Sequence, residues 1–253
     1  MLMKTAGISA ALIALAVAMH TSGVVNLEKP AEELGLLDAK ARHIIVGVDI
    51  TVGRENELPK DLNSIKSMMA KSNAGDRIDI FLIHARSESS QEAIFSVQMP
   101  EDSGPMGLAL QRAQKAAQCS LSEKWDKSIA LYSNEFAQAT DLFGFFRFVS
   151  QKQAVGKSEG TVLILYTDGQ QVGDGFNFER KAPEESDLRK VRTNGLLADL
   201  NGIRITFAGV TPTHNITNRH WRKLQSWWHS YLKEAGAKDI LISSEREILS
   251  KPL

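Results

Sequence analysis

Short, continuous apolar stretches alternate along this chain with longer segments whose apolar residues recur every three or four positions. Continuous runs of Val, Ile and Leu are typical of strands buried on both faces of a parallel sheet. The predicted strands are residues 43–50, 77–85, 92–100, 160–169, 203–210 and 239–243. Pro100 ends the third run, which predicts a short strand near an edge of the sheet.

The segments with helical spacing lie between these strands. Helices are expected at about 59–73, 104–119, 128–153, 187–202 and 217–237. Gly107 and Gly144 are weak points within two of them. The glycine-rich and charged stretch 170–187 is predicted to be an irregular surface loop. Strands that alternate with helices in this order predict an α/β fold, with a doubly wound, mainly parallel central sheet and helices on both faces.

The first residues have the pattern of a targeting segment. Lys4 precedes an apolar stretch that ends in Ala16-Val17-Ala18, a small-x-small cleavage pattern. Residues 1–18 are therefore predicted to be a signal peptide, with an uncleaved N-terminal anchor as the alternative. Residues 19–41 are interpreted as a linker and residues 42–253 as one domain. The protein is expected to be exported to a periplasmic or extracellular location.

The net charge of the chain argues against two classes of partner. The sequence has thirty Lys and Arg residues and thirty Asp and Glu residues, so it has no net field that would attract nucleic acid or an anionic membrane. We expect no nucleic-acid partner, and no stable membrane insertion unless the N-terminal segment is uncleaved. The single cysteine, Cys119, excludes an internal disulfide and is expected to be a buried, inert thiol of a helix.

Two aspartates come at the ends of apolar runs. Asp49 ends the first strand and Asp168 follows the fourth. Ligands bind at the carboxyl ends of the strands in such sheets, so both carboxylates are expected at one edge. Two facing carboxylates repel unless a cation or hydrogen-bond donors lie between them. Mg²⁺ takes oxygen ligands, so the carboxylate of Asp49 and the hydroxyl of Thr51 could bind the same ion.

The order of elements from about Arg42 to Ser244, together with Asp49-Ile50-Thr51-Val52-Gly53 and Thr167-Asp168-Gly169, resembles the von Willebrand factor A domain family. In that family an Asp-x-Ser-x-Ser segment, a threonine before a later helix and an Asp-Gly pair form a metal-ion-dependent adhesion site. The resemblance implies a Mg²⁺ or another divalent cation held by Asp49, Thr51 and Asp168. It also implies a protein partner whose acidic side chain completes the metal shell.

The sequence departs from that pattern at two ligand positions. Gly53 stands where the family has its second serine. An alignment of residues 101–110 with the helix start puts Gly104 at the threonine position, so Ser103 is the candidate substitute. The alternative without a metal is that Asp49 caps or hydrogen-bonds nearby loop amides and Asp168 starts a turn.

Other functions were weighed against binding. An exported metal-dependent phosphohydrolase could use Asp49 and Asp168, but the haloacid-dehalogenase-like class needs a second aspartate where Thr51 stands. A third alternative is a metal-independent structural component of an envelope or secretion complex. The helix at 217–237 carries tryptophans and basic residues, yet its spacing predicts that Trp221 and Trp228 pack in the core, with Trp227 and Tyr231 at a flank or partner surface. The expectation is a non-enzymatic binding module.

Overall fold

The computed structural model of the chain describes residues 41–88, 92–136, 138–155, 160–210 and 217–246. The chain divides into two compact units, Met1–Lys40 and Ala41–Leu253, and every described residue belongs to the second. The predicted signal peptide, and the predicted linker apart from Ala41, lie outside the described residues. In the described ranges, no helix is both long enough and apolar enough to cross a membrane.

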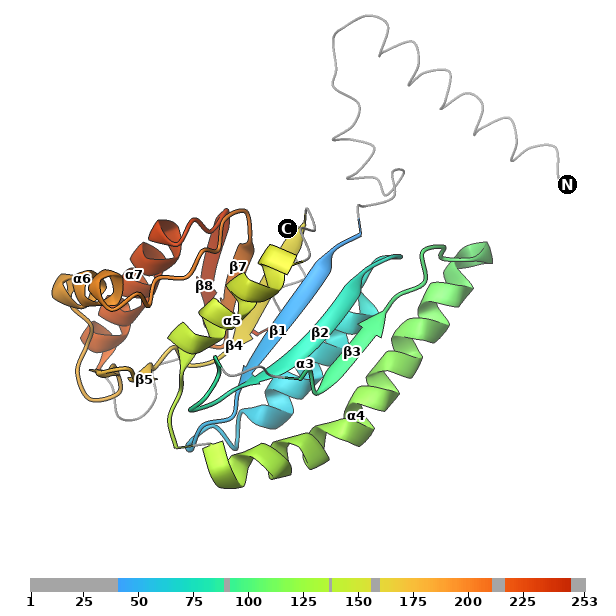
Figure 1. Cartoon of the computed structure of the whole chain (residues 1–253). Coiled ribbons are helices and arrows are strands. Elements are labelled where there is room, and N and C mark those ends of the chain that lie inside the picture. Colours follow the sequence, from blue (N-terminus) through green and yellow to red (C-terminus); the bar gives the residue numbers. More distant parts are fainter. Residues whose placement is uncertain (1–40, 89–91, 137, 156–159, 211–216, 247–253) are drawn as a thin grey trace, which may run out of the picture. The chain divides into compact units, whose positions relative to one another are not determined.

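A six-stranded sheet with the order β3-β2-β1-β4-β7-β8 forms the centre of the domain (Figure 1). Its strands are β1 (His43–Asp49), β2 (Arg77–Ile83), β3 (Phe95–Gln98), β4 (Thr161–Tyr166), β7 (Arg204–Ala208) and β8 (Asp239–Ser243). All neighbouring pairs are parallel except β2 and β3, which are antiparallel. The predicted doubly wound, mainly parallel α/β fold is confirmed, with β1 in a central position and the short β3 at an edge.

Helices cover both faces of the sheet (Figure 1). They are α3 (Leu58–Ala70), the 3₁₀ turn η1 (Pro105–Gly107), α4 (Leu108–Phe136), α5 (Leu142–Val155), α6 (Glu185–Thr193) and α7 (Asn218–Glu234). Alternate residues of each strand point to opposite faces. Ile44 and Val46 of β1 pack with α3 and α4, whereas Ile45 packs with α5 and α7. The two apolar layers therefore arise from one continuously apolar strand.

Gly47 lets α5 approach the central strand closely. A Cβ atom at this position would lie 2.7 Å from Cε1 of Phe145 on α5 and 2.8 Å from Cδ2 of Leu165 on β4. Both neighbours are fully buried, so neither side chain has free space to move into. The glycine therefore fixes the distance between β1 and α5, the two elements that lead to the candidate site.

Aromatic side chains fill the space between α5 and α7. Phe143 of α5 packs against both Trp227 and Tyr231, and Phe178 packs edge-on against Trp227 with 4.8 Å between ring centroids. Trp227 and Tyr231 are buried, so their predicted place at a flank or partner surface is wrong. Trp221, predicted to lie in the core, is only partly buried. Phe178 comes directly after a hairpin at residues 172–177 and covers the ring of Trp227.

The helix predicted at 128–153 is two helices. α4 ends at Phe136 and α5 begins at Leu142, so the break lies before Gly144 rather than at it. Two side chains satisfy the first free amides of α5: Oδ1 of Asp141 accepts from the Gly144 N–H at 2.8 Å, and Oε1 of Gln171 accepts from the Leu142 N–H at 2.7 Å. Gln171 is distant in sequence, so its part in this helix start cannot be read from a local pattern.

The predicted surface loop at 170–187 contains a small hairpin, and the prediction of an irregular loop is wrong in this part. The hairpin pairs β5 (Val172–Gly173) with β6 (Phe176–Asn177). Asp174 and Gly175 between them have φ values of 52° and 80°. An Asp-Gly pair with two positive φ values is the favoured two-residue hairpin connection.

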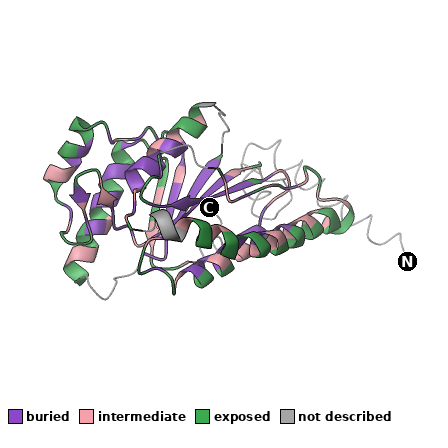
Figure 2. Ribbon diagram, turned by 60° about the horizontal axis from the view of Figure 1, so that its bottom comes forward, coloured by how far each residue is buried: buried purple, intermediate pink, exposed green. Residues whose placement is uncertain are grey.

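Cys119 is exposed, contrary to the prediction of a buried thiol. The buried side of α4 is formed by Ala117, Leu121 and Trp125, at spacings of four residues. A residue two positions after Ala117 lies on the opposite side of a helix. Figure 2 shows this exposed side running along α4.

Candidate functional site

β1 and β4 end at the same edge of the sheet, which we call the site edge. The two strands are neighbours and parallel, with Val48 opposite Tyr166. Asp49 is the last residue of β1, and Thr167 and Asp168 follow β4 directly. The structure therefore places the two predicted aspartates on adjacent strands at one edge.

The carboxylate of Asp49 is fully buried and held by two threonines. Its Oδ1 accepts from the Thr51 N–H at 3.0 Å and from the Thr51 hydroxyl at 2.7 Å. Its Oδ2 accepts from the Thr167 hydroxyl at 2.7 Å. Such bonds to the ionised form compensate the loss of hydration of a buried carboxylate. The carboxylate is thereby fixed in direction at the end of β1.

Thr140 brings a third hydroxyl to this cluster. Its Oγ1 donates to Oγ1 of Thr51 across 3.0 Å, and its carbonyl oxygen accepts from the Val172 N–H at 3.0 Å. Thr140 is buried and stands two residues before α5. A loop from a distant part of the chain is thus locked onto the hydroxyl of Thr51.

Sequence reasoning missed Thr140. The segment Ala139-Thr140-Asp141-Leu142 lies inside the stretch 128–153, whose helical spacing predicts one continuous helix. The signal was nevertheless present, because Thr140 and Asp141 come directly before an apolar run, which is typical of a helix start.

Ser103, the predicted substitute for that threonine, does not reach the site edge. β3 runs antiparallel to β2, with Gln98 opposite Arg77 at the start of β2. The segment after β3 therefore lies at the other end of the sheet, where the Gly75 N–H donates to the carbonyl oxygen of Pro100. A seven-residue strand such as β2 spans roughly 20 Å. Ser103 follows this segment and so cannot share an ion with Asp49.

Asp168 is partly exposed at the site edge. Its Oδ1 accepts from the Gln170 N–H at 2.9 Å, which closes a tight turn after β4. Desolvation and repulsion by the Asp49 carboxylate raise the pKa of Asp168 to about 6. The turn is also tied to α7, because the indole N–H of Trp228 donates to the carbonyl oxygen of Gly169 at 2.7 Å.

Gly53, which stands at the family's second serine position, has a backbone reason for being glycine. Its φ is 95°, a conformation that residues with a side chain rarely adopt, although a Cβ there would have no neighbour within 4 Å. Its N–H donates to both carboxylate oxygens of Glu55, at 3.1 and 3.0 Å. The backbone after Thr51 therefore favours glycine at this position, and glycine has no hydroxyl to offer.

Arg54, the next residue, is a buried cation beside the cluster. Its Nε donates to the carbonyl oxygen of Asp49 at 3.1 Å, and its Nη2 donates to Oδ2 of Asp61 on α3 at 2.7 Å. Burial acts to lower the pKa of Arg54, but the surrounding carboxylates outweigh it and raise this pKa. These carboxylates are Asp49, Asp61 and Asp168. Sequence reasoning did not single out Arg54, whose role depends on contacts that only the fold creates.

Asp61 is shared between two arginines. Besides Arg54, its carboxylate accepts from Nε of Arg246 at 2.9 Å, and Arg246 also pairs with Glu57. Burial still raises the pKa of Asp61, despite both guanidinium groups. The residues that follow β8 are thus attached to the first turn of α3.

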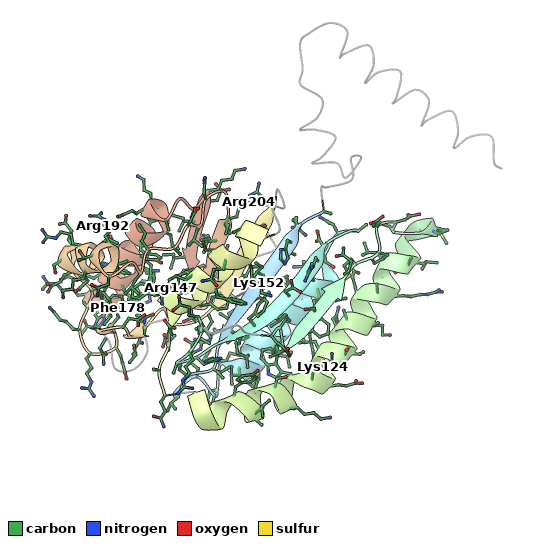
Figure 3. All side chains as sticks on the ribbon, in the orientation of Figure 1. Lys124, Arg147, Lys152, Phe178, Arg192 and Arg204 are labelled. Carbon is green, nitrogen blue, oxygen red and sulfur yellow. The ribbon has the colours of Figure 1, made fainter. Side chains whose placement is uncertain are left out.

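A second group of charges lies beside the Thr140 loop. Arg147 of α5 donates to Glu88 at 2.6 Å and lies 3.9 Å from a carboxylate oxygen of Asp174 in the hairpin (Figure 3). Burial raises the pKa of the neighbouring Asp141. These contacts attach α5, the hairpin and the segment after β2 to one another next to the site edge.

The oxygen atoms at the site edge fit the requirements of a hard cation. Mg²⁺ takes oxygen ligands and keeps several of its waters, so two carboxylates and two hydroxyls would suffice. In the described residues, Oδ2 of Asp49 has a single donor and Oγ1 of Thr140 has none, so lone pairs remain for an ion. No three His, Cys, Asp or Glu side chains converge in the described part of the chain, so the hydroxyls of Thr51 and Thr140 would be needed.

Comparison with known proteins gives structural similarity only. No protein-family profile matches the chain, and no curated protein does. Among solved structures, proximal thread matrix protein 1 of the mussel byssus has 13% identity and a TM-score of 0.38, over 83% of this chain and 45% of that one. The pilus adhesin SpaC of Lactobacillus rhamnosus GG has 13% identity and a TM-score of 0.39, over 83% and 29%. The human COPII-coat protein Sec24c has 8% identity and a TM-score of 0.37, over 66% and 25%. This chain therefore spans less than half the length of each of the three.

Proposed function

We propose that this chain is an exported protein-binding module that contacts its partner at the site edge, through a divalent cation held by Asp49, Thr51, Thr140 and Asp168. The observation that carries this proposal is the 3.0 Å contact between the hydroxyls of Thr140 and Thr51 beside the Asp49 carboxylate. It joins oxygen ligands from two distant loops at the end of the central strand. Export rests on the predicted signal peptide at residues 1–18.

The ligand set also suits the resemblance to the von Willebrand factor A family. A threonine before a helix is the element of that pattern that Ser103 could not supply, and Thr140 before α5 supplies it. A cation in this place would neutralise the repulsion between Asp49 and Asp168. An acidic side chain of the partner would complete the metal shell, so the partner surface is expected to be acidic at its centre.

The arrangement favours binding over phosphoester hydrolysis. A nucleophilic aspartate needs a carboxylate oxygen free to attack and a nearby general acid. The residue two positions after Asp49, where the haloacid-dehalogenase-like class has this acid, is Thr51. Turnover of p-nitrophenyl phosphate by the purified protein with Mn²⁺ would contradict the proposal.

The first test is calorimetric titration of the mature protein, residues 19–253, with MgCl₂ and MnCl₂. Thr140→Val removes one hydroxyl at nearly constant volume, and Asp168→Asn removes one charge. We expect saturable heat in the wild type and a loss of it in both variants, with circular dichroism unchanged. Thr193→Val is the matched control, since Thr193 lies exposed on α6 and its hydroxyl bonds only locally to the Arg189 carbonyl oxygen.

The second test addresses the partner. The immobilised protein is exposed to the envelope and secreted fractions of the producing cells, with Mn²⁺ or with EDTA. A protein retained by the wild type and by Thr193→Val, but released by EDTA and not retained by Thr140→Val, would support the cation-dependent module. Retention that ignores both EDTA and Thr140→Val would favour the metal-independent structural component instead.

A further inference from the structure

Arg54 is a cation that the fold holds beside the candidate metal site. The residue is 5% exposed, and its guanidinium bonds both to the end of β1 and to Asp61 on α3. The backbone fixes the same residue, because its N–H donates to the Thr51 carbonyl oxygen at 3.1 Å. The side chain therefore cannot leave the site edge without breaking its bonds to β1 and to Asp61.

The carboxylates around Arg54 differ in whether they have another charged partner. Asp61 is shared with Arg246, which also pairs with Glu57, so the two arginines and two carboxylates of this group balance. In the described residues, by contrast, the side chains of Asp49 and Asp168 accept hydrogen bonds only from neutral donors, and the charge of Arg54 acts on both. Arg54 therefore provides part of the positive charge that a metal ion would otherwise supply to these two carboxylates.

The loop that carries Arg54 also lacks a ligand. Gly53 stands where the family has a serine, and the guanidinium of the next residue bonds to the carbonyl oxygen of Asp49. One potential metal ligand is thus absent and one permanent positive charge is present, within two successive residues. Both features act against a divalent cation: the first reduces the number of ligands, and the second repels the ion.

We propose that Arg54 is a built-in counter-cation that weakens divalent-cation binding at the site edge. This inference rests on the proposed function, because it concerns the affinity of the same site. It makes Arg54 a residue that sets cation dependence rather than a ligand. Its removal should tighten metal binding, whereas removal of an ordinary structural arginine should not.

The test compares Mn²⁺ affinities by calorimetry. Arg54→Gln removes the charge but keeps a donor for the Asp49 carbonyl oxygen. We expect it to bind Mn²⁺ about tenfold more tightly than the wild type, as befits loss of a repelling unit charge within roughly 10 Å of the ion. Arg54→Lys keeps the charge and should stay within about threefold of the wild type on the same electrostatic argument.

The matched control is Arg42→Gln. Arg42 forms an ion pair of the same kind, with Nη2 at 2.7 Å from Oδ2 of Asp76, but at the opposite end of the sheet from the site edge. It changes the net charge of the protein by the same amount, so its Mn²⁺ affinity should equal that of the wild type. Tighter binding in Arg42→Gln as well would assign the effect to net charge and overturn the proposal.

Arg54→Gln leaves Asp61 with one partner fewer, and this variant could unfold. The comparison is therefore repeated in the Asp61→Asn background, where glutamine and asparagine can form a neutral hydrogen bond. Asp61→Asn/Arg54→Gln should again bind Mn²⁺ about tenfold more tightly than Asp61→Asn alone, on the same electrostatic argument. Equal or weaker binding after loss of Arg54 in whichever backgrounds remain folded would overturn the inference.

The outcomes separate the inference from the proposed function. Metal binding by Arg54→Gln but not by the wild type would support the counter-cation and refute cation-dependent binding by the natural protein. If the wild type binds Mn²⁺ and Arg54→Gln leaves its affinity unchanged, the result would support cation-dependent binding by the natural protein and refute the counter-cation. If neither protein binds Mn²⁺, both proposals fail.

Discussion

Gly47→Ala tests whether the spacing between β1 and α5 is set by the missing side chain. The added Cβ would lie 2.7 and 2.8 Å from two ring carbons of Phe145 and 2.8 Å from a methyl carbon of Leu165. Carbon atoms in contact normally lie about 3.5–4.0 Å apart, so roughly 1 Å of movement is required. Because the surrounding side chains are fully buried, that movement must come from α5 or the sheet.

The expected loss of stability follows from overpacking, which typically costs about 1–3 kcal/mol. Alanine in a strand recovers about 0.5–1 kcal/mol relative to glycine, because it has less conformational entropy to lose. With middle values of about 2 kcal/mol for overpacking and about 0.75 kcal/mol recovered, we expect a net decrease of about 1 kcal/mol in the free energy of unfolding, equivalent to about 2–4 °C in melting temperature for a domain of this size.

The assay is urea unfolding followed by circular dichroism, with the m-value as a check on two-state behaviour. Gly47→Ala/Phe145→Leu serves as the control, because the smaller side chain removes two of the close contacts. Loss of stability in the double variant should be less than the sum of the two single losses. A Gly47→Ala protein as stable as the wild type would refute the packing argument. So would strictly additive losses.

Three further predictions concern charge, anchoring and exposure. Burial acts to raise the pKa of Asp79, but hydrogen bonds, led by that with His43, lower it from its ordinary value of 3.8 to about 2. This carboxylate should therefore contribute about 2 kcal/mol of stability above pH 4, and the contribution should be lost as the pH falls from about 4 to 2. Asp79→Asn should lack this loss in urea unfolding measured across that pH range, and an unchanged pH profile would contradict the assignment. Trp228→Phe should lower the free energy of unfolding by about 1–3 kcal/mol, because the buried carbonyl oxygen of Gly169 loses its donor. The same urea assay measures this change, and a loss no larger than that of a substitution at an exposed position would argue against a stabilising role of this hydrogen bond. Cys119 should react fully with a maleimide reagent under native conditions, as judged by mass spectrometry, whereas reaction only in denaturant would mean that the thiol is covered.

The sheet was predictable because its strands are apolar on both sides. Runs such as 43–50 and 160–169 contain enough β-branched residues for a buried parallel strand, and alternation with helices then fixes the fold class. The positions of Asp49 and Asp168 followed from the same reasoning, since any residue at the end of a parallel strand lies at the ligand-binding edge. These predictions needed only local patterns.

The errors share a different origin. Ser103 was selected without knowledge that β3 runs antiparallel, and strand direction is set by pairing between distant segments. The local helix-start signal of Thr140 and Asp141 is outweighed by the helical spacing on both sides of it, and the contact that completes the cap of α5 comes from Gln171, which is remote in sequence. Trp227 was placed at a flank since nothing local indicates that Phe178 covers it. In each case a contact over a long sequence separation decided the outcome.

The reversed direction of β3 has a consequence for how this domain can change. The connection from β3 to α4 is carried to the end of the sheet opposite Asp49, and residues there such as Glu101, Asp102 and Met106 are exposed. Doubling the length of a flexible loop costs only about 0.6 kcal/mol in closure entropy. Insertions, purification tags or whole added modules between residues 101 and 102, before the hydrogen-bonded start of α4, should therefore be tolerated without disturbing Asp49, Thr51 or Thr140. Evolution and protein engineering have the same free position available in this fold.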